Sequence, residues 1–146
     1  MNETLRIQIE QIAGAAWEQR SEHELWLQAP AVDVRAAAQA LLAAEARLST
    51  MTALALPNGE TEVIYHWICG KQGLHIKTCT QGNHLPTITP ITAAANWIER
   101  EIMDLYAVVF DGHPDPKPLL RPSKLTAGYY REPGGAAGKA ARGEMV

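Results

Sequence analysis

The sequence predicts an α+β domain, in which an antiparallel β-sheet carries helices on one face and a disordered tail follows at the C-terminus. Amphipathic helical patterns occur near the N-terminus and again after residue 93. Between them lie apolar, β-branched runs joined by short turns, and strands joined in this way pair antiparallel. This order of elements is typical of a sheet whose helices are segregated to one side. With 146 residues and 47% hydrophobic content, the chain has material for one core.

The N-terminal region is expected to hold two helices with a strand between them. Residues 4–19 have an apolar stripe at helical spacing, made by Leu5, Ile9, Ile12, Ala13 and Ala16 with Trp17 beside it. The alternation around Leu25 and Leu27 predicts a half-buried strand. Asp33 is suited to cap a second helix, whose inward residues would be Val34, Ala38, Leu41 and Leu42.

The middle of the chain predicts three strands, at residues 51–56, 61–69 and 74–80. The first alternates apolar and small residues, and the second is rich in β-branched and aromatic residues. Turns are expected at residues 57–60 and 70–73, because both segments contain glycine next to polar residues. Residues 81–90 then form a polar, proline-containing loop that leads into the last helix.

The two cysteines are expected to be far apart in this hairpin. With residues 70–73 as the turn, Cys69 lies opposite Leu74 and Cys79 lies opposite Ile64. Neither cysteine belongs to a CxxC pair, and the five histidines show no metal-ligand spacing with them. We therefore expect neither a disulfide nor a bound iron–sulfur cluster.

The last predicted helix, from about residue 94, organises the C-terminal half. Its apolar face at helical spacing is made by Ala94, Ile98, Ile102 and Leu105. Glu101 falls on that face, so we expect it to be buried with a committed partner and its removal to matter more than that of Glu99. Arg100 and Asp104 are four residues apart and are expected to pair with each other. Pro114 and Pro116 then keep the chain extended after the helix.

The run from Glu99 to Leu120 resembles the signature of the 30-kDa subunit of respiratory complex I and of its counterpart in membrane-bound, energy-converting NiFe hydrogenases. The matching positions are Glu99, Arg100, Glu101, Asp104, Gly112, His113, Pro114 and Asp115, followed by Leu119 and Leu120. Residues 63–66 and 95–97 also resemble the layout of that family. The resemblance covers about residues 1–120, which leaves 121–146 as a flexible tail. Ala107 stands where the family usually has glycine, and Lys117-Pro118 where it usually has two arginines.

The resemblance implies a subunit without an active site, metal or cofactor of its own, in the peripheral arm of a redox assembly. It would dock beside a large subunit, hydrogenase-like or 49-kDa-like, and beside a small iron–sulfur subunit, with the eight motif positions at the subunit interface. The stretch from Asp115 to Pro122 is closer to the hydrogenase counterparts, which favours that branch. The equivalent C-type subunit of an NADH-quinone oxidoreductase (complex I) is the alternative.

The residues alone suggest three other functions. His113, flanked by acidic residues, would suit a general base, but no Ser or Cys nucleophile accompanies it at a recognisable spacing. A divalent-metal site of Glu99, Glu101 and Asp104 fails, because positions 99 and 101 point about 160–200° apart on a helix. A free-standing adaptor, unrelated to redox assemblies, stays open.

Charge and hydropathy indicate which classes of partner the chain contacts. Residues 1–120 carry 8 basic and 14 acidic side chains, which argues against a nucleic-acid surface. We expect no membrane span and no signal peptide, hence a cytoplasmic chain that meets the inner membrane only through partner subunits. Residues 121–146 are rich in glycine and alanine and are expected to be disordered. Alternatively, residues 125–131 order along a neighbouring subunit, with Tyr129 and Tyr130 as anchors.

Overall fold

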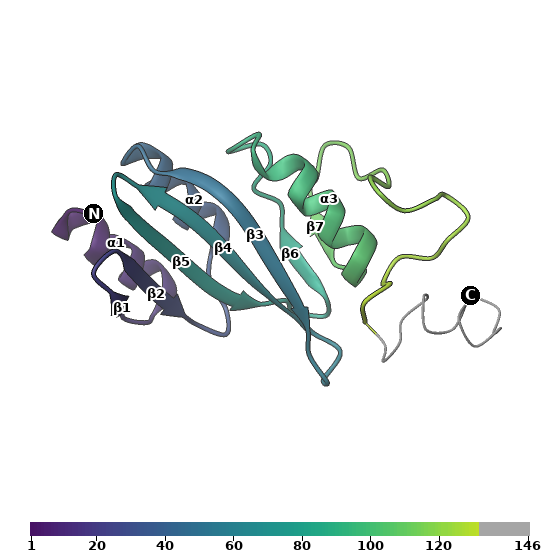
Figure 1. Cartoon of the computed structure of the whole chain (residues 1–146), viewed down its shortest axis with the longest axis horizontal. Coiled ribbons are helices and arrows are strands. Elements are labelled where there is room, and N and C mark those ends of the chain that lie inside the picture. Colours follow the sequence, from purple (N-terminus) through teal and green to yellow (C-terminus); the bar gives the residue numbers. More distant parts are fainter. Residues whose placement is uncertain (132–146) are drawn as a thin grey trace.

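The computed structural model describes residues 1–131 and has the predicted α+β architecture (Figure 1). The main sheet has five strands in the order β1-β2-β5-β4-β3. Their bounds are β1 Glu18–Ser21, β2 Glu24–Gln28, β3 Arg47–Ala55, β4 Thr61–Cys69 and β5 Gln72–Cys79. Three neighbouring pairs are antiparallel, whereas β2 and β5 are parallel. The mostly antiparallel sheet confirms the predicted class; the parallel pair arises because a helix and two strands intervene between β2 and β5.

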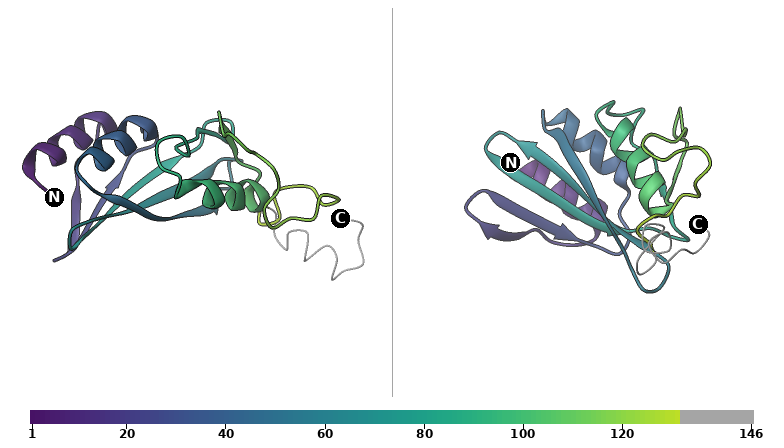
Figure 2. Two further views of the ribbon diagram at one scale, coloured as in Figure 1. Left: turned by 90° about the horizontal axis from the view of Figure 1, so that it is seen from above. Right: turned by 45° about the vertical axis from the view of Figure 1, so that its right-hand side comes forward.

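Three helices pack against the sheet. Helices α1 (Glu3–Ala13) and α2 (Val34–Ala43) lie side by side over one face (Figure 2). Helix α3 (Ala95–Tyr106) contacts β3, the edge strand farthest from β1. A small parallel sheet of β6 (His84–Pro86) and β7 (Val109–Asp111) joins the segments before and after α3. The chain on both sides of α3 is thereby tied together.

The first helix is shorter than predicted. It begins after Asn2, whose side chain accepts a hydrogen bond from the Leu5 amide at 2.8 Å. It ends at Ala13, because Gly14 has φ +66° and its amide caps the Glu10 carbonyl in a left-handed turn. Residues 18–21 form β1, so the predicted continuation to residue 19 is wrong, although Trp17 is buried as its pattern suggested.

Helix α2 and the central strands follow their predicted patterns. Asp33 accepts a hydrogen bond from the Ala36 amide at 3.0 Å, which confirms the predicted N-cap. Alternate residues of β4 point into the core against α2, as a half-buried strand requires. The buried residues of these two elements include Val34, Ala38, Leu41, Val63, Tyr65 and Trp67.

The β4–β5 hairpin has a different register from the predicted one. Its turn holds two residues, Gly70 and Lys71, so Cys69 faces Gln72 and Cys79 faces Glu62. The predicted register is therefore wrong by two residues, because Gln72 and Gly73 already belong to β5. The cysteines are still near opposite ends of the hairpin, and both are free thiols.

The described chain continues beyond Leu120, where the tail was predicted to begin, in contact with α3. The Gly128 amide donates to the Asp104 carbonyl at 2.9 Å, and the Tyr130 amide donates to the Leu105 carbonyl at 2.8 Å. Residues 121–131, expected to be disordered or to order on a neighbour, thus contact the chain's own helix α3. The rest of the predicted tail, 132–146, lies outside the described residues.

Candidate functional site

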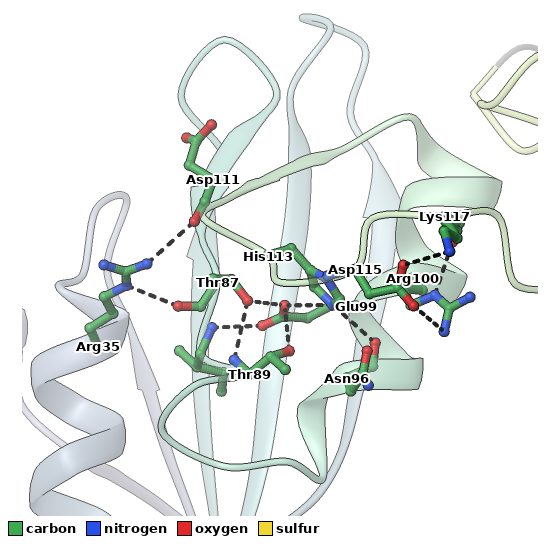
Figure 3. A network of polar contacts seen from close by, with 11 residues as sticks. Arg35, Thr87, Thr89, Asn96, Glu99, Arg100, Asp111, His113, Asp115 and Lys117 are labelled. Atoms are coloured by element: carbon green, nitrogen blue, oxygen red, sulfur yellow. Dashed lines mark hydrogen bonds and ion pairs between the residues drawn. The ribbon is translucent and has the colours of Figure 1, made fainter.

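The motif residues lie on α3 and on the segment that follows β7. We call residues 112–131 the C-terminal strap; it passes around α3 toward the helix's C-terminal end (Figure 1). The network in Figure 3 joins this strap to α3, to α2 and to the loop after β6. The motif residues therefore connect α3 to the segments around it. The contacts of each residue show which segment it fixes.

Glu99 is the buried carboxylate of the motif, with no exposed surface. It accepts hydrogen bonds from the Ile88 amide at 2.7 Å, from the Thr89 hydroxyl at 3.0 Å and from the Thr87 hydroxyl (Figure 3). Burial raises the pKa of Glu99, and its hydrogen bonds and His113 only partly oppose that shift. The carboxylate therefore anchors the loop between β6 and α3 to the helix.

The predicted burial of Glu101 is wrong. Glu101 is exposed, whereas the buried residues of the helix include Ala95, Glu99 and Ile102. The inward face is rotated by one residue from the predicted one, because the Thr87–Thr89 segment supplies polar partners that make burial of Glu99 favourable. The prediction that removing Glu101 matters more than removing Glu99 loses its physical basis.

His113 is held beside Glu99. Its Nδ1 accepts a hydrogen bond from the Asp115 amide at 3.0 Å, so the proton of the neutral ring is on Nε2. That nitrogen lies 3.4 Å from the Asn96 carbonyl and 3.7 Å from the Glu99 carboxylate. The side chain is enclosed, and Pro114 after it is exposed. The geometry matches a histidine that fixes a turn by donating to a backbone carbonyl.

Gly112 sits where the strap passes α2. Its φ is +83°, and a Cβ there would lie 3.0 Å from Nη2 of Arg35. Arg35 donates to the Thr87 carbonyl at 2.9 Å and to the Asp111 carbonyl at 3.3 Å. Sequence reasoning missed Arg35, since nothing in its helical context marks a partner more than fifty residues away. The backbone conformation favours glycine here, and a side chain would also make the Arg35 guanidinium move.

Asp104 holds the far end of the strap. Its carboxylate accepts from the amides of Leu119, Leu120 and Arg121 at 2.9, 2.7 and 3.1 Å, and Arg121 Nε lies 3.4 Å from its other oxygen. Burial would raise the pKa of Asp104, but these hydrogen bonds outweigh it and leave the pKa lowered. Asp104 is thus an ionised anchor for the strap.

The predicted pair of Arg100 with Asp104 is wrong. Arg100 donates to the carbonyls of Lys117 and Pro118 at 2.9 and 3.3 Å and lies 3.9 Å from the Asp115 carboxylate. Both residues reach across to the strap instead of along the helix, because backbone groups there offer several hydrogen bonds. An exposed ion pair along a helix adds only about 0.3–0.5 kcal/mol.

The end of the described strap is fixed by Arg131, which sequence reasoning also missed. Arg131 Nη1 donates to the Thr61 hydroxyl at 2.7 Å, to the Asn83 side chain at 3.1 Å and to the Tyr106 carbonyl at 3.1 Å. Asn83 in turn donates to the carbonyls of Tyr106 and Ala107 at 3.2 and 2.7 Å. The strap is thereby joined to β4 and to the end of α3.

Ala107, the departure from the family's glycine, occupies a left-handed position. Its φ is +54° and ψ is +26°, and its amide caps the Met103 carbonyl at 3.0 Å. An alanine in this conformation costs roughly 1–2 kcal/mol relative to the right-handed region. The preference for glycine at this position therefore follows from helix termination.

A second polar cluster crosses the sheet on the side away from α1 and α2. The Thr52 hydroxyl lies 3.0 Å from His66 Nε2, and the Nδ1 atoms of His66 and His75 are 2.7 Å apart. His75 Nε2 contacts the Glu24 carboxylate, and the Trp26 ring stacks on His75 at 4.4 Å between centroids. Sequence reasoning placed these histidines in strands without finding the cluster. The observed β4–β5 register sets His66 opposite His75, and the parallel pairing of β2 with β5 brings Glu24 and Trp26 to them.

The histidine cluster predicts an acid-sensitive contribution to stability. Burial lowers the pKa of His66, the proximity of His75 lowers it further, and Glu24 partly opposes them. The folded state therefore binds fewer protons than the unfolded chain, whose histidine pKa is about 6.5. Stability from this source is present above about pH 6.5 and is lost as the pH falls through the folded-state pKa.

The His66→Gln variant tests this expectation by urea unfolding between pH 5 and 8. We expect the acid-side loss of unfolding free energy to be smaller in the variant than in the wild type. His23→Gln, in the exposed turn between β1 and β2, is the matched control and should keep the wild-type slope. A slope unchanged in His66→Gln would contradict the prediction.

We searched the described residues for metal-binding groups and for membrane-spanning helices. Within residues 1–131, no group of three or more His, Cys, Asp or Glu side chains is arranged to hold a metal ion. None of the three helices in that range is long and apolar enough to cross a bilayer.

The fold and the motif are similar to those of small α+β subunits of complex I-like respiratory complexes. It is similar, with a TM-score of 0.63 and 27% identity, to a chain of the membrane-bound sulfane sulfur reductase, an archaeal respiratory membrane complex; the match covers 76% of this chain and 70% of that one. The sequence model of the family described as respiratory-chain NADH dehydrogenase, 30 kDa subunit, matches residues 27–132. The chain belongs to that family.

Two bacterial relatives show how much of each protein the matched region covers. The C-type subunit of the NADH-quinone oxidoreductase of Mesorhizobium japonicum is 42% identical over 62 residues, which are 40% of this chain and 31% of the relative. The C/D-type subunit of the same enzyme from Edwardsiella ictaluri is 41% identical over 71 residues, 46% of this chain and 12% of the relative. The chain therefore matches less than a third of the length of either relative.

Proposed function

We propose that this chain is a structural subunit, without an active site of its own, in the peripheral arm of a membrane-bound energy-converting hydrogenase of the NiFe type. The observation that carries the proposal is that the motif carboxylates make their hydrogen bonds within the chain. Glu99 and Asp104 are both buried and are hydrogen-bonded within the chain, where they fix the loop before α3 and the strap after it. Groups held in this way set the shape of a docking surface instead of meeting a substrate.

The proposed partners are a large subunit, hydrogenase-like or 49-kDa-like, and a small iron–sulfur subunit. The Edwardsiella relative supports a large neighbour, since the C-type and D-type designations are joined in one polypeptide there. The nickel, iron and iron–sulfur centres would belong to the partners, and this chain would carry no cofactor. It would lie on the cytoplasmic side of the inner membrane and contact no nucleic acid.

The hydrogenase branch is favoured over the quinone-reducing one by two observations. Lys117 and Pro118 replace the two arginines usual in the family, and Arg100 binds their carbonyls and not their side chains. The similarity to a chain of a sulfane sulfur reductase also supports a place outside the NADH-quinone oxidoreductases. The C-type subunit of an NADH-quinone oxidoreductase is the second candidate, supported by the name and 42% identity of the Mesorhizobium relative.

Purification of the tagged chain from membranes of its native host tests the proposal. We expect co-purification of a large NiFe-site subunit and a small iron–sulfur subunit, with hydrogen-dependent dye reduction by the complex and none by the isolated chain. A quinone-site large subunit in place of the NiFe subunit would favour the second candidate. Turnover by the isolated chain, abolished in His113→Ala, would overturn both and support a small enzyme.

A further inference from the structure

A pocket of about 310 Å³ lies between the C-terminal end of α3 and the C-terminal strap. Apolar side chains form most of its wall, namely Leu105, Leu120, Pro122, Leu125, Tyr129 and Tyr130. Leu120 and Tyr130 are 62% and 55% exposed, values that are high for side chains of this size. The pocket therefore presents an apolar opening at the surface of the described chain.

Hydrogen bonds to α3 and packing of tyrosine rings fix the wall of the pocket. Asp104 accepts three strap amides on one side, and the Tyr130 amide donates to the Leu105 carbonyl on the other. The rings of Tyr129 and Tyr130 meet edge to face with centroids 5.2 Å apart. The ring centroids of Tyr106 and Tyr130 are 5.9 Å apart. A site shaped by such contacts is largely formed before a ligand arrives, which lowers the entropic cost of binding.

The part of the strap that lines the pocket has the opposite charge to the chain before it. Residues 117–131 carry four basic side chains and no acidic one, whereas residues 1–116 carry seven basic and fourteen acidic ones. Arg121 and Arg131 have partners within the fold, Asp104 and Thr61 among them, and Lys117 lies 3.9 Å from the Asp115 carboxylate. Lys124 is exposed and stands in sequence between the pocket residues Pro122 and Leu125. An apolar pocket with a basic edge fits an apolar side chain on an acidic segment.

We propose that this pocket receives an aromatic or aliphatic side chain from an acidic segment of the neighbouring large subunit. This inference rests on the function proposed above. It adds which kind of segment of the large subunit contacts this chain, and where. The polar groups nearest the floor, Asp104 and Arg121, are bonded to each other and to the strap backbone. A small polar ligand would find few free groups to orient it, whereas a partner's apolar side chain needs only the shape and the basic edge.

Site-specific photo-crosslinking in the native complex tests the assignment. Leu120, or in a second variant Tyr130, is replaced by p-benzoylphenylalanine, which the exposure of both residues should allow. The tagged chain is purified with its complex, irradiated, digested and analysed by mass spectrometry. We expect a cross-linked peptide from the large subunit that contains an aromatic or aliphatic residue within three positions of Asp or Glu. The same label at Leu54, exposed on β3, should not yield that peptide.

Charge reversal provides the second readout. Lys124→Glu, combined with the label at Leu120, should lower the yield of the cross-link about fivefold, because an exposed charge contact of this kind is worth up to about 1 kcal/mol. Lys71→Glu, in the β4–β5 turn, should leave the yield unchanged. An unchanged yield in Lys124→Glu would overturn the acidic character assigned to the partner segment.

Failure of this inference and failure of the proposed function give different results. A chain that co-purifies with the redox subunits but cross-links to its own residues 132–146, to lipid, to a second copy, to a peptide without acidic residues or to nothing overturns the pocket assignment alone. A chain that co-purifies with no redox subunit overturns both.

Discussion

Replacing Glu99 with alanine is expected to lower the free energy of unfolding by about 3 kcal/mol, which for a domain of this size corresponds to a fall of roughly 10 °C in melting temperature. The variant leaves the Ile88 amide without its acceptor and removes the acceptor of the Thr87 and Thr89 hydroxyls, all in a buried site. Unpaired buried donors carry the full cost of losing water. Thermal and urea unfolding of the purified chain measure the change.

Glu101→Ala is the matched control, since it removes the same side chain two residues away at an exposed position. It should change the unfolding free energy by less than about 0.5 kcal/mol. Equal effects of the two substitutions would refute the burial of Glu99 and restore the assignment made from the apolar pattern.

The Glu99→Gln variant adds a test by pH. Because burial raises the pKa of Glu99 above its unfolded value of about 4.3, the folded state binds more protons between these two pKa values. The stability that the carboxyl contributes is fully present below about pH 4.3 and is lost as the pH rises through the folded-state pKa. The advantage of the wild type over Glu99→Gln should therefore shrink with rising pH. A constant difference would contradict the raised pKa.

The apolar pattern predicted much of the fold but placed the inward face of α3 one residue away. Helix α2 and strand β4 matched because their apolar periodicity and the Asp33 cap are local signals. Glu99 failed the same reasoning, since its burial depends on the Thr87–Thr89 segment more than nine residues earlier, and hydropathy assigns any carboxylate to the surface. A polar residue at a core position is where local pattern and tertiary structure disagree.

Three short strands were also missed. Strand β1 is exposed throughout, and β6 and β7 alternate over only three residues each, which is too short a run to detect. The motif residues themselves were found, but their roles were not: Arg100 and Asp104 both bind the strap, and which backbone groups they reach is set by how residues 117–121 fold back on α3. Spacing within a helix carries no information about that return.

Replacing Asp104 with alanine is expected to release the C-terminal strap from α3 while the sheet and its helices stay folded. The carboxylate accepts from three consecutive strap amides and pairs with Arg121, so its loss removes the contacts that fix residues 119–121. Hydrogen bonds to a charged group contribute about 1.5–3 kcal/mol, but the released amides regain water. We expect the free energy of local opening to fall by about 2 kcal/mol, which is roughly a thirtyfold faster amide exchange in the strap.

Hydrogen exchange and limited trypsin digestion of Asp104→Ala measure this opening, because Lys124, which precedes Leu125, offers a cleavage site within the strap. Asp111→Ala is the matched control: its side chain is 57% exposed and contacts only His84 among the described residues, and its backbone carbonyl still accepts from Arg35. It should leave exchange in the strap unchanged.

The lowered pKa of Asp104 gives the same prediction a pH dependence. Its hydrogen bonds hold the folded-state pKa below the unfolded value of about 3.9, so the strap's attachment is fully present above that pH and is lost as the pH falls through the folded-state pKa. Wild-type exchange in residues 119–121, corrected for the intrinsic rate, should thus approach that of Asp104→Ala in acid. A difference between the two chains that stays constant with pH would contradict the lowered pKa. If the two chains exchange equally at every pH, the carboxylate is not what attaches the strap, and the shape of the pocket must come from Arg131 and the tyrosines instead.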